Sequence, residues 1–371
     1  MNTKKYNSEF YSLPKDKTYE VFQDYIKTNL DLYLKKIDEY DGSLSTIIKA
    51  NKTKIEALCS AIIKAIDVYL LGSPYKSYSI LSPALNDLKD FFLIPKPDKR
   101  ILLSSKNLKS FFRIRESYQK IVSPQEMLHI PFECRHKIPT NRYSIPGVPC
   151  MYMSNTLHLC WEELGRMKIK YLYCTRIEFD INSLNLVNLE YTPAKIAFLN
   201  QPYKSIKGES DFFFKESLVT WPISFVSSIK TKYPKASFKI EYIIPQLIMQ
   251  WCKESPFLEG ISYFSTKGYP QLVNDIPLNH INIALPAKTN QSSGLCPELV
   301  KKLRSTDPFR IKNLMYCKKK QLNNSEKLKW LEKNPDGFIN YIHRAVKTEN
   351  KNPTIFDWVE MELCKSEAEK F

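Results

Sequence analysis

The hydrophobic period of the chain changes along its length, and this change constrains the fold most. Between Ile55 and Ile66 apolar residues recur at three- and four-residue spacing, and Gly72-Ser73-Pro74 ends the pattern. Such spacing buries one face of an amphipathic helix. Beyond residue 100 the period becomes two, which predicts a strand with Arg113 and Arg115 on one face. Helices followed by strands and further helices indicate the α+β class.

Other segments show one of the same two periods. We expect helices over Tyr19–Ile37, Asn155–Arg166, Gln246–Lys253 and Phe338–Val346, and a further helical cluster that closes with Leu88–Phe92. We expect strands over Cys150–Ser154, Tyr171–Phe179, Gly260–Thr266 and Ile281–Leu285. Pro95 and Pro97 lie among charged residues and suggest a linker over 94–100. We therefore predict a helical N-terminal module over 1–100, a mixed α+β domain over 101–290 and a helical, basic C-terminal region over 291–371.

The chain is strongly basic but otherwise has the composition of a globular protein. Its 371 residues are 43% hydrophobic, and 55 Lys and Arg against 39 Asp and Glu give a net charge of +16. Two explanations fit this net charge: a surface that binds an anionic partner, or a general enrichment of the chain in lysine. Composition alone does not distinguish between them.

Cysteine usage and the termini point to a reducing compartment. The nine cysteines include no CxxC pair and no Cys–His spacing typical of a zinc site. The N-terminus has no apolar run of a signal peptide, and charges interrupt the most apolar segment, Ile55–Leu71. We expect a cytoplasmic protein without a membrane or metal partner.

Common catalytic motifs are missing from the sequence. It has no GxxxxGK[ST], GxGxxG, HExxH or GxSxG run, and only 9 glycines. Glycine-rich phosphate loops of the P-loop and Rossmann types are thereby excluded. The five histidines show no pairing that suits a metal ion.

What remains is a concentration of arginine, tyrosine and carboxylate residues over 142–166. Arg142, with Arg113 or Arg115, offers planar donors that match a pyrophosphate. Tyr152 offers a face for a planar heterocycle, and a glutamate at position 162 or 163 could stabilise an oxocarbenium-like transition state. Both glutamates flank the apolar stripe of the expected helix at similar angles, so periodicity leaves the choice between them open.

Three ordered blocks resemble the RES-domain family, named for its arginine, glutamate and serine. The blocks are Arg113 and Arg115 followed by HIPFECRHKIPTNRYSIPGVPCMYMSNTLHLCWEELGR (129–166), then GISYFSTKGYP (260–270), then NHINIALP (279–286). The resemblance covers about residues 108–288. Arg142, Tyr152 and Glu163 match the spacing of the family's Arg, Tyr and Glu, which favours Glu163 over Glu162.

The resemblance implies an NAD+-degrading enzyme with a fold similar to diphtheria-toxin-like ADP-ribosyltransferases, including their mixed sheet. Such an enzyme cleaves the nicotinamide–ribose bond as a glycohydrolase or phosphorylase. Carried over residue by residue, Arg142 would bind the phosphates or ribose of NAD+, Tyr152 would pack on nicotinamide, and Glu163 would stabilise the oxocarbenium-like state. Arg113, Arg115, Tyr143 and Ser265 complete the expected substrate-binding set.

Family members are often toxins with a cognate antitoxin protein, so the resemblance implies NAD+ as substrate and an antitoxin as partner. The sequence leaves open the acceptor, which is water, phosphate or a protein target, and the oligomeric state. One hypothesis is that the helices over 1–100 regulate the site. Besides NAD+ cleavage and transfer of ADP-ribose to a protein, a third possible function is that of a basic nucleic-acid-binding or interaction protein. The chain has no nucleic-acid-binding signature that would support it.

Overall fold

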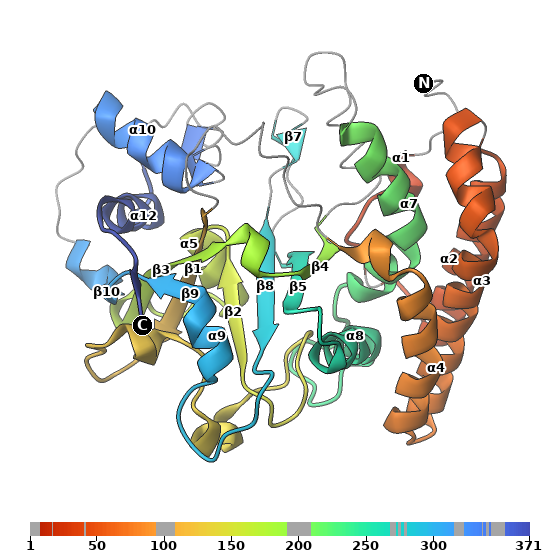
Figure 1. The fold of residues 1–371 in the computed structure, drawn as a ribbon, viewed down its shortest axis with the longest axis horizontal. Coiled ribbons are helices and arrows are strands. Elements are labelled where there is room, and N and C mark those ends of the chain that lie inside the picture. Colours follow the sequence, from red (N-terminus) through yellow and green to blue (C-terminus); the bar gives the residue numbers. More distant parts are fainter. Residues whose placement is uncertain are drawn as a thin grey trace. The chain divides into compact units, whose positions relative to one another are not determined.

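The fold is described from a computed structural model of the chain (Figure 1). It describes residues 8–16, 18–40, 42–93, 108–190, 209–267, 272–273, 276–277, 280–314, 323–335, 337–338, 341–342 and 353–371. The chain forms two compact units. Unit 1 comprises Met1–Ile94, Pro139–Pro146 and Leu186–Ser255, and unit 2 comprises Pro95–Ile138, Gly147–Asn185 and Pro256–Phe371.

Unit 1 is mainly helical. Its elements are α1 (Ser8–Tyr11), α2 (Phe22–Asp38), α3 (Gly42–Leu70), α4 (Pro74–Asp87), α7 (Glu209–Ser227), α8 (Ile243–Glu254), the 3-10 helices η2 (Lys89–Phe92) and η7 (Ile240–Tyr242), and the short strand β4 (Leu186–Leu189). The helices expected over Tyr19–Ile37, Ile55–Leu71 and Gln246–Lys253 are confirmed as α2, α3 and α8. In Figure 1, α2, α3 and α4 run side by side. Unit 1 thus joins the N-terminal helices to residues 186–255, which the sequence-based division assigned to the central domain.

Helix α7 is an element that the sequence did not predict. It is rich in aromatic and β-branched residues, contains Pro222, and is buried over its described side chains from Glu216 to Ser227. A helix buried on all sides has no apolar stripe, so periodicity does not reveal it. Trp221 holds it in place by stacking on Tyr33 and Phe225, with ring centroids 5.0 and 4.9 Å away.

Unit 2 is built on an antiparallel sheet. Its strands are β1 (Leu108–Glu116), β2 (Cys150–Ser154), β3 (Leu172–Asp180), β5 (Gly260–Phe264), β8 (Ile281–Pro286), β9 (Leu303–Ser305), β10 (Phe309–Arg310) and β11 (Glu369–Lys370). Their order is β11-β9-β3-β1-β2-β8-β5, and β10 pairs with β3. Strands β6 (Leu272–Val273) and β7 (Ile276–Pro277) form a separate pair. The strands expected around Arg113, over Cys150–Ser154, Tyr171–Phe179, Gly260–Thr266 and Ile281–Leu285 are confirmed, and so is the α+β class.

Several α-helices and 3-10 helices accompany the sheet among the described residues of unit 2. They are α5 (Leu157–Glu163), α9 (Pro297–Lys302), α10 (Asn324–Lys333), α12 (Ile355–Lys365), η3 (Pro124–Met127), η4 (Phe132–Lys137), η5 (Ile169–Tyr171), η6 (Ile181–Ser183) and η8 (Ile311–Leu314). The expected helix over 155–166 is confirmed as the shorter α5. The proposed linker over 94–100, the triplet Lys318–Lys320 and part of the expected helix over 338–346 lie outside the described residues.

The C-terminal helix α12 is part of the core of unit 2. Its Val359 and Leu363 pack with Phe112 and Ile114 of β1 and with Leu157 of α5. In Figure 1 this helix lies beside α10, near the strands that it covers. The C-terminal region therefore stabilises the sheet directly. Along the described part of the chain, no helix is long and apolar enough to cross a bilayer.

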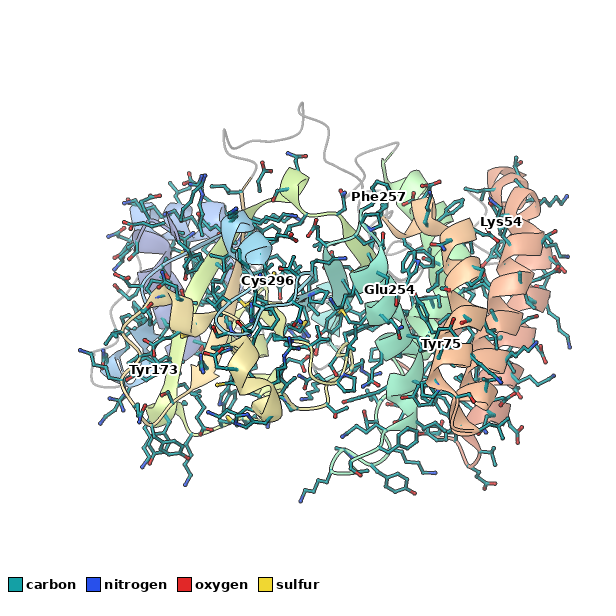
Figure 2. The ribbon with its side chains drawn as sticks, turned by 60° about the horizontal axis from the view of Figure 1, so that its bottom comes forward. Lys54, Tyr75, Tyr173, Glu254, Phe257 and Cys296 are labelled. Carbon is teal, nitrogen blue, oxygen red and sulfur yellow. The ribbon has the colours of Figure 1, made fainter. Side chains whose placement is uncertain are left out.

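Most of the described cysteines and His129 lie in the interior of the fold. Six of the eight described cysteines are buried, and all eight carry free thiols. Cys296, labelled in Figure 2, donates its backbone N–H to His129 Nε2 over 2.9 Å. Burial lowers the pKa of His129, which keeps Nε2 unprotonated as the acceptor. His129 is thus a hydrogen-bonded core residue.

Candidate functional site

Helix α5 is held at its first turn by two side chains from different parts of unit 2. Thr156 Oγ1 accepts the Leu159 N–H over 3.1 Å, and Glu360 Oε1, from α12, accepts the Leu157 N–H over 2.6 Å. N-terminal N–H groups of a helix have no partner within the helix, so these two contacts define where α5 begins. The last residue of α5 is Glu163.

Glu163 is the centre of a polar cluster at the end of α5. Its Oε1 accepts hydrogen bonds from Ser265 Oγ over 2.6 Å and from Asn282 Nδ2 over 2.7 Å. Lys267 Nζ donates to the backbone carbonyl of Glu163 over 2.6 Å and lies 3.6 Å from Oε2. The predicted pair of Glu163 and Ser265 is therefore in direct contact.

The two donors to Oε1 are themselves held by further hydrogen bonds. Ser265 Oγ accepts the Lys267 N–H over 3.1 Å, so its own proton points to Glu163. Asn282 Oδ1 accepts the Ser154 hydroxyl over 2.6 Å, which directs Nδ2 towards Glu163. Ser154, Ser265 and Asn282 are buried, whereas the Glu163 side chain is 28% exposed. The cluster fixes one carboxylate oxygen from within the fold and leaves part of the side chain accessible to a ligand.

Glu162 has different surroundings from its neighbour. Its carboxylate accepts from Arg166 Nε over 2.9 Å and lies 3.8 Å from His158 Nε2, both within the same helical segment. These contacts join residues four positions apart and involve no strand of the sheet. Of the two glutamates that periodicity left open, only Glu163 contacts Ser265 of the second sequence block.

Tyr152 lies on the same face of the sheet as the residues that bind Glu163. In the antiparallel pairing of β2 and β8, Tyr152 opposes Ala284 and Ser154 opposes Asn282. Residues that oppose each other, and residues two apart on a strand, share a face. Tyr152 is half-buried there, so part of its ring is accessible.

Arg113 and Arg115 alternate with the core residues Phe112 and Ile114 of β1, so they project from the opposite face. Arg113 Nη1 donates to the Tyr152 carbonyl over 2.7 Å and Nη2 to the Leu128 carbonyl over 3.3 Å. Arg115 Nη1 donates to the Glu126 carbonyl. Burial, with a smaller contribution from Arg115, lowers the pKa of Arg113 to about 10. Both arginines tie β1 to neighbouring backbone.

Arg142 and Tyr143 belong to unit 1, whereas the other predicted site residues belong to unit 2. Arg142 donates from Nη1 to the Ser227 carbonyl and from Nη2 to the Ile229 carbonyl, each over 2.9 Å, and lies over the ring of Tyr242. Tyr143 is 2% exposed, so its ring is part of the core. Within unit 1 these two residues have the surroundings of structural residues.

Sequence reasoning missed three members of the cluster, namely Ser154, Lys267 and Asn282. Asn282 lies inside the matched run NHINIALP, where a polar side chain stands between apolar neighbours of a buried strand. A buried amide needs a partner, so this pattern was a signal for a functional or structural contact. Lys267 follows the matched Ser265 by two residues and had no signal of its own.

Metal-ligating residues do not cluster in the part of the chain that the structure describes: it contains no group of three or more His, Cys, Asp or Glu residues able to hold an ion. Tyr173 of β3, labelled in Figure 2, packs against Arg310 of β10, whose guanidinium lies 5.5 Å from the centroid of the tyrosine ring.

A comparison with curated proteins links the chain to one relative. The chain is 32% identical over 262 residues to "Putative toxin YopC" of Bacillus subtilis (strain 168), and the match covers 69% of this chain and 58% of that protein. The chain thus spans less than two thirds of the length of the relative it matches. No protein-family model matches the chain, and no solved structure does. The comparisons therefore establish similarity to a protein that bears the name of a toxin.

Proposed function

We propose that this protein is an NAD+-degrading toxin that cleaves the nicotinamide–ribose bond, with Glu163 as the residue that stabilises the transition state. The observation that carries the proposal is the Glu163 cluster. Its carboxylate is held by Ser265 and Asn282 through one oxygen, and the side chain is partly exposed.

This arrangement suits a reaction in which positive charge develops on a sugar. Loss of nicotinamide leaves an oxocarbenium-like ribose, which a fixed carboxylate stabilises more than it stabilises the substrate. Because Ser265 and Asn282 already orient Glu163, little reorganisation is needed when the charge appears. Tyr152, on the same sheet face, would pack against the nicotinamide ring.

The arginines have a smaller part in the proposal. Phe112 opposes Ser154, so Arg113 and Arg115 project from the sheet face opposite to that of Tyr152, and their guanidinium groups donate to backbone carbonyls. They would therefore contribute only longer-range positive charge to the binding of NAD+. Arg142 would have to exchange its carbonyl bonds before it could bind a phosphate, and Tyr143 would act only through packing. The carboxylate cluster, not the arginines, supports the reaction class.

The toxin part of the proposal rests on the name of the B. subtilis relative and on the resemblance to RES-domain proteins. Membership of that family, a cognate antitoxin and a cytoplasmic location belong to the same proposal. NAD+ would be the substrate, and no other cofactor is required for this chemistry.

Incubation of the purified chain with NAD+, with and without inorganic phosphate, tests the proposal. We expect release of nicotinamide together with ADP-ribose or its phosphorylated form. Label from adenylate-labelled NAD+ that appears on a protein would instead identify an ADP-ribosyltransferase. Absence of nicotinamide release both with and without phosphate would contradict the proposed bond cleavage.

A further inference from the structure

We infer that Asn282 is a positioning residue that holds Glu163 through Oε1 and thereby reserves Oε2 for the substrate. The inference rests on the proposed function of Glu163. It assigns a role to a buried strand residue that the expected catalytic set does not include.

The first step of the argument is the orientation of the Asn282 amide. Its Oδ1 accepts the Ser154 hydroxyl over 2.6 Å, and its Nδ2 donates to Glu163 Oε1 over 2.7 Å. An amide rotated by half a turn would place Oδ1 against the carboxylate, where two acceptors repel each other. The Glu163 carboxylate therefore selects the rotamer in which Asn282 is a donor, and the Ser154 hydroxyl stabilises the same rotamer by donating to Oδ1.

The second step is the inequality of the two carboxylate oxygens. Oε1 accepts from both Ser265 and Asn282, so its two lone pairs are engaged. Oε2 has the Lys267 ammonium at 3.6 Å, which is an ion pair beyond hydrogen-bond distance. Oε2 is thus the oxygen available to a ribose hydroxyl or to developing positive charge.

The third step is the choice of asparagine at this position. Asn282 is 2% exposed, and a buried carboxylate there would stand next to that of Glu163. Two close carboxylates resist joint ionisation, so an acid at 282 would weaken the charge that Glu163 presents. A neutral donor holds Glu163 in place and leaves its charge intact.

The Asn282→Asp variant tests this role because it keeps the shape and removes the donor. We expect kcat for nicotinamide release to fall by about 100-fold, with KM for NAD+ changed by less than about threefold, since the lost contact acts on transition-state charge. Ser154→Ala, which removes the donor that holds Asn282 Oδ1 in place, is expected to lower kcat by about 10-fold, again without a change in KM.

Asn185→Asp is the matched control. Asn185 Nδ2 donates to the Phe257 carbonyl over 3.0 Å at a solvent-accessible position, so aspartate there also removes an amide donor, but outside the Glu163 cluster. We expect its kcat to stay within about twofold of the wild type. Circular dichroism and melting temperature verify folding, and Ser154→Ala decides the question if Asn282→Asp does not fold.

The outcomes separate the two proposals. An active wild type whose Asn282→Asp and Ser154→Ala variants keep its kcat, or lose only affinity, would overturn the role of Asn282 alone. A folded wild type that releases no nicotinamide would overturn the proposed function, and the positioning role with it.

Discussion

Glu360 of the C-terminal helix α12 accepts the backbone N–H of Leu157, the first residue of α5, over 2.6 Å, although the two residues are 203 positions apart. Its second oxygen accepts from Asn334 Nδ2 over 2.6 Å. The carboxylate is 1% exposed. The end of the chain therefore anchors the helix that presents Glu163.

Replacing Glu360 with alanine should destabilise unit 2. The change leaves the buried Leu157 N–H and Asn334 amide without their acceptor, and we expect the free energy of unfolding to fall by about 2 kcal/mol. Urea denaturation measures this. Glu362→Ala removes an exposed ion pair with Lys365 on the same helix and should leave stability nearly unchanged. Equal losses in both variants would contradict the anchoring role.

Glu163→Gln should abolish NAD+ cleavage and preserve the fold. Glutamine keeps one oxygen as an acceptor for Ser265 and Asn282 but removes the charge that the transition state requires, so we expect kcat to fall by about 1,000-fold. Glu162→Gln should have little effect, because Glu162 pairs with the exposed Arg166 and has no contact with Ser265 or Asn282. Nicotinamide release measures both variants, and the reverse ranking would show that Glu163 is not the active carboxylate.

Arg142→Ala should act mainly on stability. It removes the donors to the buried carbonyls of Ser227 and Ile229, and we expect the free energy of unfolding to fall by about 3 kcal/mol. Arg166→Ala, at an exposed position, serves as the control. If Arg142→Ala instead keeps its stability and only raises KM for NAD+, a phosphate-binding role for Arg142 would be favoured.

Glu216 of α7 should make unit 1 less stable as the pH rises. Burial raises the pKa of this carboxyl from 4.5 to about 8, so the folded chain keeps a proton that the unfolded chain releases above pH about 4.5. The stabilising contribution is present at low pH and is lost as the pH approaches 8.

Glu216→Gln should therefore remove this pH dependence. We expect the free energy of unfolding of the variant, minus that of the wild type, to be roughly 2 kcal/mol larger at pH 8 than at pH 5. This value allows for solvent screening of the carboxyl. Thermal melts at both pH values measure this difference. Glu56→Gln, at an exposed site on α3, provides the baseline. A difference that stays constant with pH would show that the buried carboxyl does not titrate in this range.

Much of the fold could be predicted because its signals are local. Helices α2 and α3 follow from the spacing of their apolar residues, and β1 follows from its alternation of polar and apolar side chains. Helix α7 could not be predicted because its described side chains, from Glu216 to Ser227, are all buried and leave no exposed polar face, and because its aromatic, β-branched sequence favours a strand. The grouping of residues 186–255 with the N-terminal helices depends on packing between distant segments.

The sequence by itself determined many of the helical and strand segments and limited the candidate carboxylate to position 162 or 163, and the family spacing then favoured Glu163. Only the tertiary structure decided which side chains meet Glu163. Ser265 and Asn282 are 102 and 119 positions away, and they reach Glu163 because strand pairing places β8 beside β2 and β5 beside β8. It also placed Arg113 on the other sheet face from Tyr152, because its neighbour Phe112 opposes Ser154, and Arg142 among carbonyls of unit 1. Hydrophobic periodicity acts between neighbours in sequence, whereas a site is assembled by long-range pairing and packing, which no local pattern encodes.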